Sequence, residues 1–193
     1  MRKRLGVMCS GNGTNFQNIV TNQLCNHHEV VLMVHNTKKC GAVKRATKYG
    51  IPHVRIPHKN EDDMIKLFEV YQVDLIILAG YMRVLKNPSK FPCPIINVHP
   101  SLLPKYKGLN AVEQAMESED KITGCTVHYV NEELDGGETI LQAEVPILPD
   151  DDIISLTKAV QRQEYVILPK AIENVKHQLQ KQDSRYLLSN HIN

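Results

Sequence analysis

The stretch from residue 95 to residue 104 joins a short apolar run to two side chains that can handle an oxyanion and a proton. The run Ile95–Val98 contains Asn97, and His99 follows it, just before a proline-bounded loop. Residues two apart on a strand face the same side, so Asn97 and His99 are predicted to project together. An amide N–H and an imidazole can both donate to a developing oxyanion, and the imidazole can also carry a proton. The pair therefore predicts a reaction centre for acyl transfer.

A carboxylate that could serve this centre lies on a later glycine-rich turn, Glu132-Glu133-Leu134-Asp135-Gly136-Gly137. A carboxylate beside His99 would favour the charged imidazolium, as acid–base sites require. Ordinary explanations stay open for both residues. His99 can be a satisfied core histidine at a strand end, and Asp135 can be plain turn chemistry, since Asp-Gly is a common hairpin pair. His128, on another predicted strand, is interpreted as a packed or supporting histidine.

A second group of residues predicts a phosphate site. Ser10-Gly11-Asn12-Gly13-Thr14-Asn15 follows an apolar run and opens a predicted helix, so backbone N–H groups and the positive helix end point at one spot. Phe16 stands where a dinucleotide fingerprint needs its third glycine, and the loop lacks the lysine of a Walker motif. The loop therefore favours a phosphate monoester over NAD or ATP. A glycine turn that only joins strand to helix is the alternative.

Composition narrows the class of protein. The formal net charge of the 193 residues is 23 − 21 = +2, too small to imply a nucleic-acid surface. The five cysteines are scattered without a CxxC pair, which argues against a disulfide framework and a structural zinc site. Cys25 with His27 and His28 is a possible metal cluster, but no second ligand pair accompanies it. The chain lacks a signal-peptide core and any apolar run of about 18 residues, so a soluble, cytoplasmic protein is expected.

The apolar pattern predicts an α/β fold. Short runs rich in Val, Ile and Leu fit buried parallel strands, and stretches with helical spacing lie between them. The predicted strands are Leu5–Cys9, Glu29–Val34, His53–Ile56, Leu75–Ala79 and Ile95–Val98, and the predicted helices are Asn15–Asn22, Gly41–Tyr49 and Glu61–Tyr71. This alternation predicts a Rossmann-like, doubly wound and mostly parallel twisted sheet flanked by helices.

The C-terminal half changes character. Gly124–Val130 and Ile140–Val145 are predicted to form an antiparallel strand pair added to the sheet. Asp152–Leu168 predicts a long helix that Pro169 kinks or restarts, with a second helical stretch to about residue 180. The tail from Gln182 is expected to fray. We expect one domain over residues 1–193, with a phosphate-binding half (1–100), a second half with the C-terminal helices (101–181) and the tail (182–193).

Several ordered segments are similar to one known family. They are Cys9–Asn15, Leu78–Leu85, Asn97–Gly108, Gly124–Gly137 and Val160–Glu164. Together they closely resemble the folate-dependent formyltransferases, and within them the enzymes that act on glycinamide ribonucleotide. The resemblance covers roughly residues 4 to 175, and several motifs in order are far more specific than any one alone.

This resemblance implies transfer of a formyl group from 10-formyltetrahydrofolate to the amine of glycinamide ribonucleotide, without a metal. It implies a catalytic trio of Asn97, His99 and Asp135, with His99 the proton donor. The implied binding residues for the ribonucleotide are Gly11, Asn12, Gly13, Thr14 and Asn15 at the phosphate and Gln161 and Glu164 at the ribose. Those implied for the folate are Met82, Arg83, Val84 and Leu85 at the pterin and Asn131, Glu132, Glu133 and Leu134 opposite, beside Asn97 and Asp135.

The chain departs from the family pattern in two places. Many members carry a histidine in the helix after the Lys-Gly turn, whereas Asn110-Ala111-Val112-Glu113 has none. The segment around Pro57–Asn60 is shorter than in relatives, which leaves Lys59 as a candidate folate or phosphate contact. Small-molecule partners, no nucleic acid, no membrane and a monomer or homodimer are expected.

Three alternatives compete with this reading. A methionyl-tRNA formyltransferase would need a tRNA-binding domain and a basic surface, and the length and net charge of this chain are not those expected for either. A formyltetrahydrofolate deformylase shares the core but uses water as acceptor, and the phosphate loop favours a phosphorylated acceptor instead. A non-enzymatic folate- or nucleotide-binding module would have no use for a histidine paired with a carboxylate.

Overall fold

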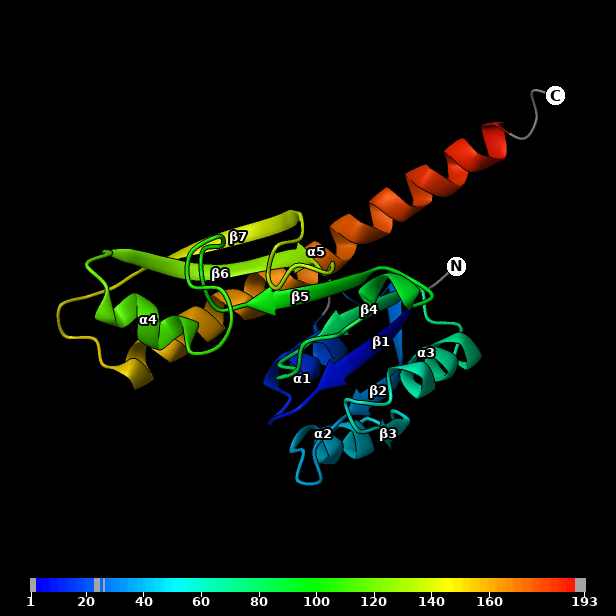
Figure 1. Cartoon of the computed structure of the whole chain (residues 1–193), viewed down its shortest axis with the longest axis horizontal. Coiled ribbons are helices and arrows are strands. Elements are labelled where there is room, and N and C mark those ends of the chain that lie inside the picture. The colour runs from blue at the N-terminus through cyan, green and yellow to red at the C-terminus, as the bar shows by residue number, and fades with distance from the viewer. Residues whose placement is uncertain (1–2, 23–24, 26, 190–193) are drawn as a thin grey trace.

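A seven-stranded sheet forms the centre of the molecule (Figure 1). The computed structural model describes residues 3–22, 25 and 27–189. The strand order is β3-β2-β1-β4-β5-β6-β7, parallel from β3 to β5, with β6 and β7 antiparallel. The strands are β1 Lys3–Cys9, β2 His28–His35, β3 His53–Arg55, β4 Leu75–Leu78, β5 Ile95–His99, β6 Ile122–Tyr129 and β7 Thr139–Pro146. The predicted fold class, with its antiparallel pair in the C-terminal half, is confirmed.

The order of the strands creates a switch point between β1 and β4. From β1 the chain builds outward through β2 to β3, and it then returns to the other side of β1 to add β4 and β5. The loops that leave the carboxyl ends of β1 and β4 therefore diverge to opposite faces, and such a point is where open α/β sheets bind ligands. The predicted phosphate loop, Ser10–Asn15, follows β1, and the segment containing Met82–Leu85 follows β4.

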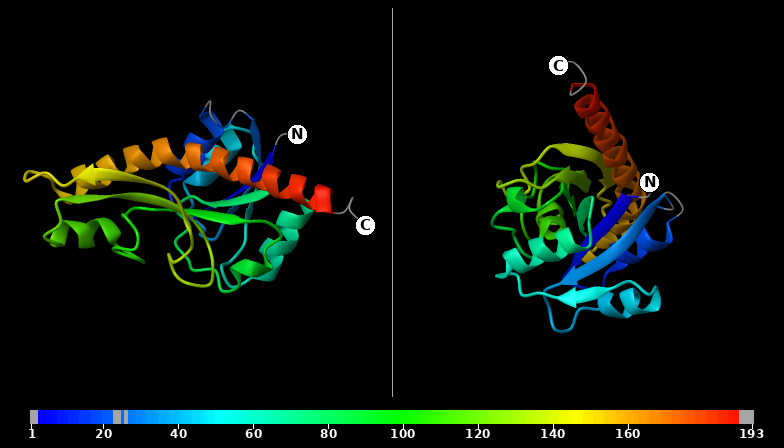
Figure 2. Two further views of the ribbon diagram at one scale, coloured as in Figure 1. Left: turned by 90° about the horizontal axis from the view of Figure 1, so that it is seen from above. Right: turned by 90° about the vertical axis from the view of Figure 1, so that its right-hand side faces the viewer.

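Helices cover both faces of the sheet. They are α1 Thr14–Thr21, α2 Ala42–Lys48, α3 Glu61–Val70, α4 Ala111–Glu117 and α5 Ile153–Ser189, with a 3-10 turn, η2, at Pro88–Lys90. Successive side chains of β1 point to opposite faces of the sheet, so this strand contributes to two buried clusters. Leu5 and Val7 pack with α1, α2 and α5, whereas Met8 packs with α3. Figure 2 shows α1 and α5 on one side of the sheet and α3 on the other.

The C-terminal helix differs from the sequence prediction. The predicted restart of the helix at Pro169, its end near residue 180 and the fraying from Gln182 are wrong as far as Ser189, because α5 continues as one helix to that residue. Residues 190–193 lie outside the described part of the chain. A proline removes one helical hydrogen bond, but the turns on either side of Pro169 are fixed by the core. Leu168 and Ile172 are fully buried there, so packing maintains the helix where propensity would end it.

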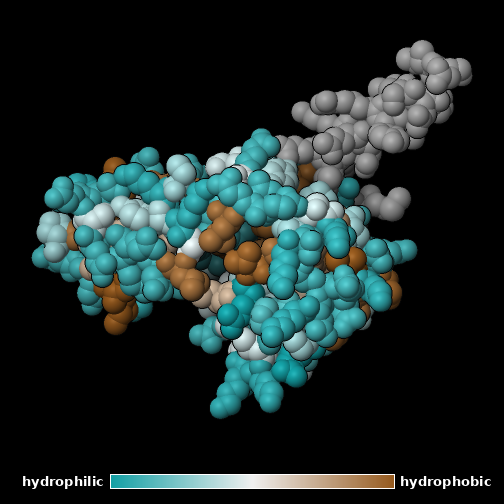
Figure 3. Space-filling model, in the orientation of Figure 1, coloured by the Kyte–Doolittle hydropathy of each residue, from teal (hydrophilic) through white to brown (hydrophobic). Residues whose placement is uncertain are grey.

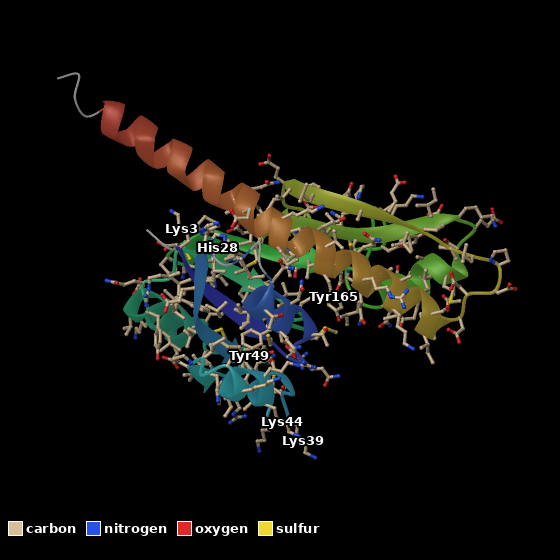
Figure 4. All side chains as sticks on the ribbon, turned by 180° about the vertical axis from the view of Figure 1, so that it is seen from behind. Lys3, His28, Lys39, Lys44, Tyr49 and Tyr165 are labelled. Atoms are coloured by element: carbon tan, nitrogen blue, oxygen red, sulfur yellow. The ribbon has the colours of Figure 1, made fainter. Side chains whose placement is uncertain are left out.

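A close contact between a histidine and a glutamate joins the sheet to this helix. His28, at the start of β2, lies with Nε2 2.7 Å from Oε1 of Glu173 on α5, and Figure 4 shows His28 beside that helix. The pair and the apolar contacts of α5 fix the helix across the sheet, which brings its first turns to the carboxyl end of β1.

Among the described residues, no helix is both long and apolar enough to cross a membrane.

The close packing of α3 on β1 predicts that Gly6→Ala destabilises the protein. A Cβ at Gly6 would lie 2.6 Å from Cε1 of Phe68, a fully buried ring on α3. Overpacking of this kind costs about 1–3 kcal/mol, which urea unfolding would measure. Gly11→Ala is the matched control, because its Cβ would meet nothing within 4 Å. Equal stability of the two variants would contradict the packing described here.

Candidate active site

One cavity of about 910 Å³ opens at the carboxyl ends of β1, β4 and β5. Figure 3 shows hydrophobic side chains bordering a hollow near the centre of this face. The predicted site residues that line the cavity are Gly11, Asn12, Gly13, Thr14, Asn15, Met82, Arg83, Val84, Leu85, Asn97, His99, Asn131, Glu133, Leu134, Asp135, Gln161 and Glu164. Two candidates are not among the lining residues: Glu132, whose side chain bonds to Ser89, and Lys59. Segments more than 150 residues apart in sequence thus meet at one place.

Asp135 lies at the centre of the polar residues of this cavity. Its Oδ2 is 3.4 Å from Nδ1 of His99, and its Oδ1 is 3.6 Å from Nε2 of His128. The backbone N–H of Gly108 also donates to Oδ2, at 2.8 Å. Burial by itself would raise the pKa of Asp135, but the nearby His128, the hydrogen bond from the Gly108 N–H and the neighbouring His99 outweigh it. The pKa of Asp135 therefore lies below its usual value, and the residue is a buried carboxylate ion.

Both ring nitrogens of His99 face oxygen acceptors. Nδ1 faces Asp135, and Nε2 lies 2.8 Å from the carbonyl oxygen of Tyr106. A neutral imidazole carries one N–H and can satisfy only one of these acceptors, whereas an imidazolium satisfies both. The ring is also 95 % buried, since its relative exposure is 5 %. The end of β5, where the cavity begins, therefore offers an oxygen acceptor to each ring nitrogen of His99.

Asn97 and His128 form the other half of the site. They are cross-strand partners on β5 and β6, and the Nδ2 group of Asn97 lies 3.3 Å from Nε2 of His128. Nδ1 of His128 donates to the carbonyl of Tyr129 at 2.8 Å, so Nε2 accepts from Asn97 when the ring is neutral. An amide has two N–H groups, so the second N–H of Asn97 is available to a ligand in the cavity. Asn97 and His99 share one face of the strand, as predicted.

Strained backbone borders the site. Asp135, Tyr106 and Asn110 all have positive φ angles, of 48°, 56° and 58°, which non-glycine residues rarely adopt. All three lie in the two loops that follow β5 and β6 and border the cavity. Such conformations persist only where the surrounding contacts fix them, and they are typical of functional sites.

The phosphate loop lies at one end of the cavity. Gly13 has a φ of 70°, and a Cβ there would lie 2.5 Å from the Cβ of Ala42, so only glycine fits between this loop and α2. The loop is followed directly by α1, whose first N–H groups have no helical partner and suit an anion. Arg45 donates to the carbonyl of Asn12 at 2.7 Å and fixes the loop from the α2 side.

Asn15 and Glu164 meet deeper in the same end of the cavity. Nδ2 of Asn15 donates to Oε2 of Glu164 at 2.8 Å. Burial raises the pKa of Glu164, and the Asn15 amide offsets only part of that effect. Oδ1 of Asn15 is buried and accepts no hydrogen bond from the described residues. A buried acceptor without a donor marks a place for a ligand donor such as a hydroxyl.

The segment at the other end of the cavity is fixed from beneath. Glu61, a buried carboxylate in the first turn of α3, accepts from the N–H groups of Lys86 and Asn87 at 2.7 and 3.2 Å. Ser10 accepts from the N–H of Met82 at 2.8 Å and donates to Asn36. Ser10 therefore ties the phosphate loop to the segment containing Met82–Leu85. Met82 and Val84 remain largely exposed, which leaves apolar surface at the cavity mouth.

Sequence reasoning missed the groups that hold these residues in place. The Tyr106 carbonyl and the Gly108 N–H are main-chain groups, and side-chain type carries no signal for them. Glu61 is one of three consecutive acidic residues at the start of a predicted helix, and its residue type alone does not single it out. A buried carboxylate in a helical first turn is visible only once the loop that covers it is in place. His128 fits its interpretation as a packed, supporting histidine.

The fold and the cavity together define an α/β enzyme whose candidate active site lies at the strand ends of a doubly wound sheet. The family model described as "Formyl transferase" matches residues 3–172. The chain therefore belongs to the formyl transferase family, and the family resemblance seen in the sequence is confirmed.

The chain is also similar to individual proteins. The chain is 39% identical over 184 residues to the phosphoribosylglycinamide formyltransferase of Haemophilus influenzae, covering 89% of this chain and 86% of that protein. It is 42% identical over 184 residues to the trifunctional purine biosynthetic protein adenosine-3 of Drosophila melanogaster, of which it spans 14% with 89% of its own length. The crystal structure of phosphoribosylglycinamide formyltransferase from Anaplasma phagocytophilum superposes with a TM-score of 0.87 at 35% identity, covering 92% of this chain and 89% of that one.

The lowered pKa of Asp135 predicts a pH-dependent effect of Asp135→Asn on stability. A carboxyl group whose pKa is lower in the folded state stabilises the fold above its unfolded pKa, and this contribution is lost as the pH falls through the folded value. The gap in free energy of unfolding between the wild type and Asp135→Asn should therefore be largest near neutral pH and narrow in acid. Urea unfolding over a pH series would measure it, with the exposed Asp62→Asn as control. A gap that widens in acid would contradict the assignment.

Proposed function

We propose that this protein transfers the formyl group of 10-formyltetrahydrofolate to the amino group of glycinamide ribonucleotide, giving formylglycinamide ribonucleotide and tetrahydrofolate in purine biosynthesis. One observation carries the proposal. The trio of Asn97, His99 and Asp135 lies in a single cavity between a phosphate-type loop and an apolar segment that can receive a flat ring. Two relatives named for this activity, at 39% and 35% identity, support it.

The acceptor end fits a phosphorylated ribose. Main-chain N–H groups at Gly11–Thr14 and the start of α1 would hold the phosphate. Two adjacent sugar hydroxyls would donate to Glu164 and to the buried Oδ1 of Asn15, which otherwise lacks a donor among the described residues. Gln161, one turn before Glu164 on α5, lines the same wall. The ribonucleotide amine would then point toward the end of β5.

The donor end fits a pterin. The segment Met82–Leu85 offers main-chain groups for hydrogen bonds to the ring edge and the apolar side chains of Val84 and Leu85. Asn131–Leu134 would lie on the other side of the ring, with the exposed Leu134 as an apolar contact. Because Glu132 lies outside the lining, its contribution would be limited to the shape of this turn. The formyl group would extend from the ring toward Asn97.

The chemistry follows from the positions of these groups. The acceptor amine attacks the formyl carbon, a C–N bond forms, and the carbonyl π pair moves to the oxygen. The second N–H of Asn97 and the charge of His99 stabilise this oxyanion, while Asp135 stabilises the charge on His99. If His99 donates directly to the oxyanion, its Nε2–H is shared between that oxygen and the carbonyl oxygen of Tyr106. A proton leaves the attacking amine, N10 of the folate gains one, and the C–N10 bond breaks.

We extend the proposal to the architecture of the enzyme. The binding elements for the acceptor lie before residue 100 and on α5, and those for the donor lie after β4 and after β6. Along the sequence, the segments proposed for the donor lie between those proposed for the acceptor, so the two substrates are not bound by two separate parts of the chain. We therefore treat residues 1–193 as one catalytic domain that acts on two small molecules and does not require nucleic acid.

Formyl transfer from labelled 10-formyltetrahydrofolate, with and without glycinamide ribonucleotide, tests the proposal. Label should reach the acceptor and little should be released without it. Release to water at the same rate without the acceptor would support a deformylase. Binding of both compounds without turnover would support a non-enzymatic module.

The same assay measures the contribution of the imidazole. We expect His99→Ala to lower kcat by about 10²–10³, because removal of one preorganised charge or donor at an oxyanion has that effect. The fold should survive, as circular dichroism would show, since β5 retains its apolar contacts through Ile96 and Val98. Turnover near the wild-type value would remove His99 from the mechanism.

The raised pKa of Glu164 predicts how binding of the acceptor depends on pH. A glutamate with a raised pKa takes up its proton at a higher pH than an exposed one, and the neutral acid is a weaker acceptor for a hydroxyl. KM for glycinamide ribonucleotide should therefore rise as the pH falls, while KM for the folate stays constant. Glu164→Gln should show a high KM for the acceptor with little of this pH dependence. If Glu164→Gln kept the wild-type dependence of KM on pH, a group other than Glu164 would be responsible for that dependence.

A further inference from the structure

A three-residue segment, Tyr106–Gly108, contacts both members of the central ion pair. The carbonyl of Tyr106 accepts from Nε2 of His99 at 2.8 Å. Two residues later, the N–H of Gly108 donates to Oδ2 of Asp135 at 2.8 Å, the same oxygen that faces Nδ1 of His99. The orientation of these peptides therefore sets the position of the imidazole and of its carboxylate together.

The segment needs external contacts to keep this orientation. Tyr106 has a φ of 56°, in the left-handed region that an ordinary side chain avoids, and Gly108 has a φ of 81°. A relaxed Tyr106 would turn its carbonyl away from His99. Lys105, just before it, is tied down through its carbonyl, which accepts from the fully buried Ser101 hydroxyl at 2.6 Å.

The phenol of Tyr106 supplies the contact on the other side. Its hydroxyl donates to Oδ2 of Asp120 at 2.7 Å and lies 2.8 Å from Oγ of Ser118, both just after α4. Lys105 reaches the same Asp120 oxygen at 2.6 Å. The hydrogen bonds from Lys105 and from Tyr106 lower the pKa of Asp120, which keeps this acceptor charged. Neither Tyr106 nor Asp120 is among the residues that line the cavity.

We propose that Tyr106 is a positioning residue for the reaction, held by Asp120 outside the cavity. The anchored phenol holds the strained Tyr106 peptide with its carbonyl on His99, and the turn that follows presents the Gly108 N–H to Asp135. Asp120 thus acts on the imidazole through one side chain and one peptide, without touching a substrate. The catalytic consequence rests on the formyl-transfer function proposed above, whereas the anchor itself is open to a test that needs no turnover.

Tyr106→Phe removes one hydroxyl and keeps the ring, so it isolates the anchor. The chain, labelled with ¹⁵N-histidine, would be examined by NMR, with the His99 Nε2–H signal assigned by its loss in His99→Gln. In Tyr106→Phe this signal should move upfield or disappear through exchange with water. In the formyl-transfer assay, kcat should fall about tenfold while KM for each substrate stays within about twofold, because the ring is misplaced and the subsites are not.

Asp120→Ala, the double variant and a distant control variant separate the anchor from a general loss of stability. Asp120→Ala should reproduce both effects of Tyr106→Phe, and the double variant should be no worse than the single ones, since both remove the same hydrogen bond. Tyr49→Phe, directly after the distant α2 (Figure 4), is the matched control and should change neither readout.

The outcomes are distinct. An unmoved His99 signal in Tyr106→Phe overturns the proposal whatever the rate, and so does a moved signal with unchanged kcat. Additive losses in the double variant also overturn it, because they would show that Asp120 acts by another route. If the wild type transfers no formyl group but the His99 signal responds to Tyr106→Phe, the anchor is supported and the proposed function fails.

Discussion

The buried carboxylate of Asp135 is the interaction on which the arrangement of the site depends. It faces His99 at 3.4 Å and His128 at 3.6 Å, and it receives the Gly108 N–H at 2.8 Å. A carboxylate removed from water requires such partners, and a charged imidazole so deeply buried requires a carboxylate. His99 therefore helps to keep Asp135 ionised, and Asp135 fixes the orientation of the imidazole. The loops that follow β5 and β6 bring them together, and this requirement accounts for the strained φ angles in both loops.

The sheet topology explains why a site for two substrates forms around this pair. At the switch between β1 and β4, one loop turns toward α1 and the next toward α3, which leaves an open crevice between them. Ser10 links the two loops by accepting the N–H of Met82. The added antiparallel strands then extend the sheet beyond β5, so that Asn97 and His128 pair across the end of the crevice. The long helix α5 closes one end of the crevice through Glu164, which accepts a hydrogen bond from Asn15.

Much of the fold and many of the site residues could be predicted from the sequence, for identifiable reasons. The spacing of the apolar residues predicted the strands and the helices, because each element buries one or both of its faces. Asn97 and His99 could be paired because a strand places them on the same side. The continuation of α5 through Pro169 could not be predicted, because it depends on burial of Leu168 and Ile172 in a core assembled from distant segments. The roles of Glu61 and of the Tyr106 carbonyl escaped for the same reason, since they arise from contacts between loops.

A crystal structure of the protein with glycinamide ribonucleotide and a folate analogue that cannot transfer its formyl group would test the central claim most directly. The phosphate should lie against Gly11–Thr14, the ribose hydroxyls should contact Glu164 and Oδ1 of Asn15, and the pterin should lie along Met82–Leu85. The oxygen that represents the formyl group should then lie within hydrogen-bond distance of Nδ2 of Asn97. A complex with the two ligands exchanged between these ends, or with that oxygen remote from Asn97 and His99, would contradict the mechanism.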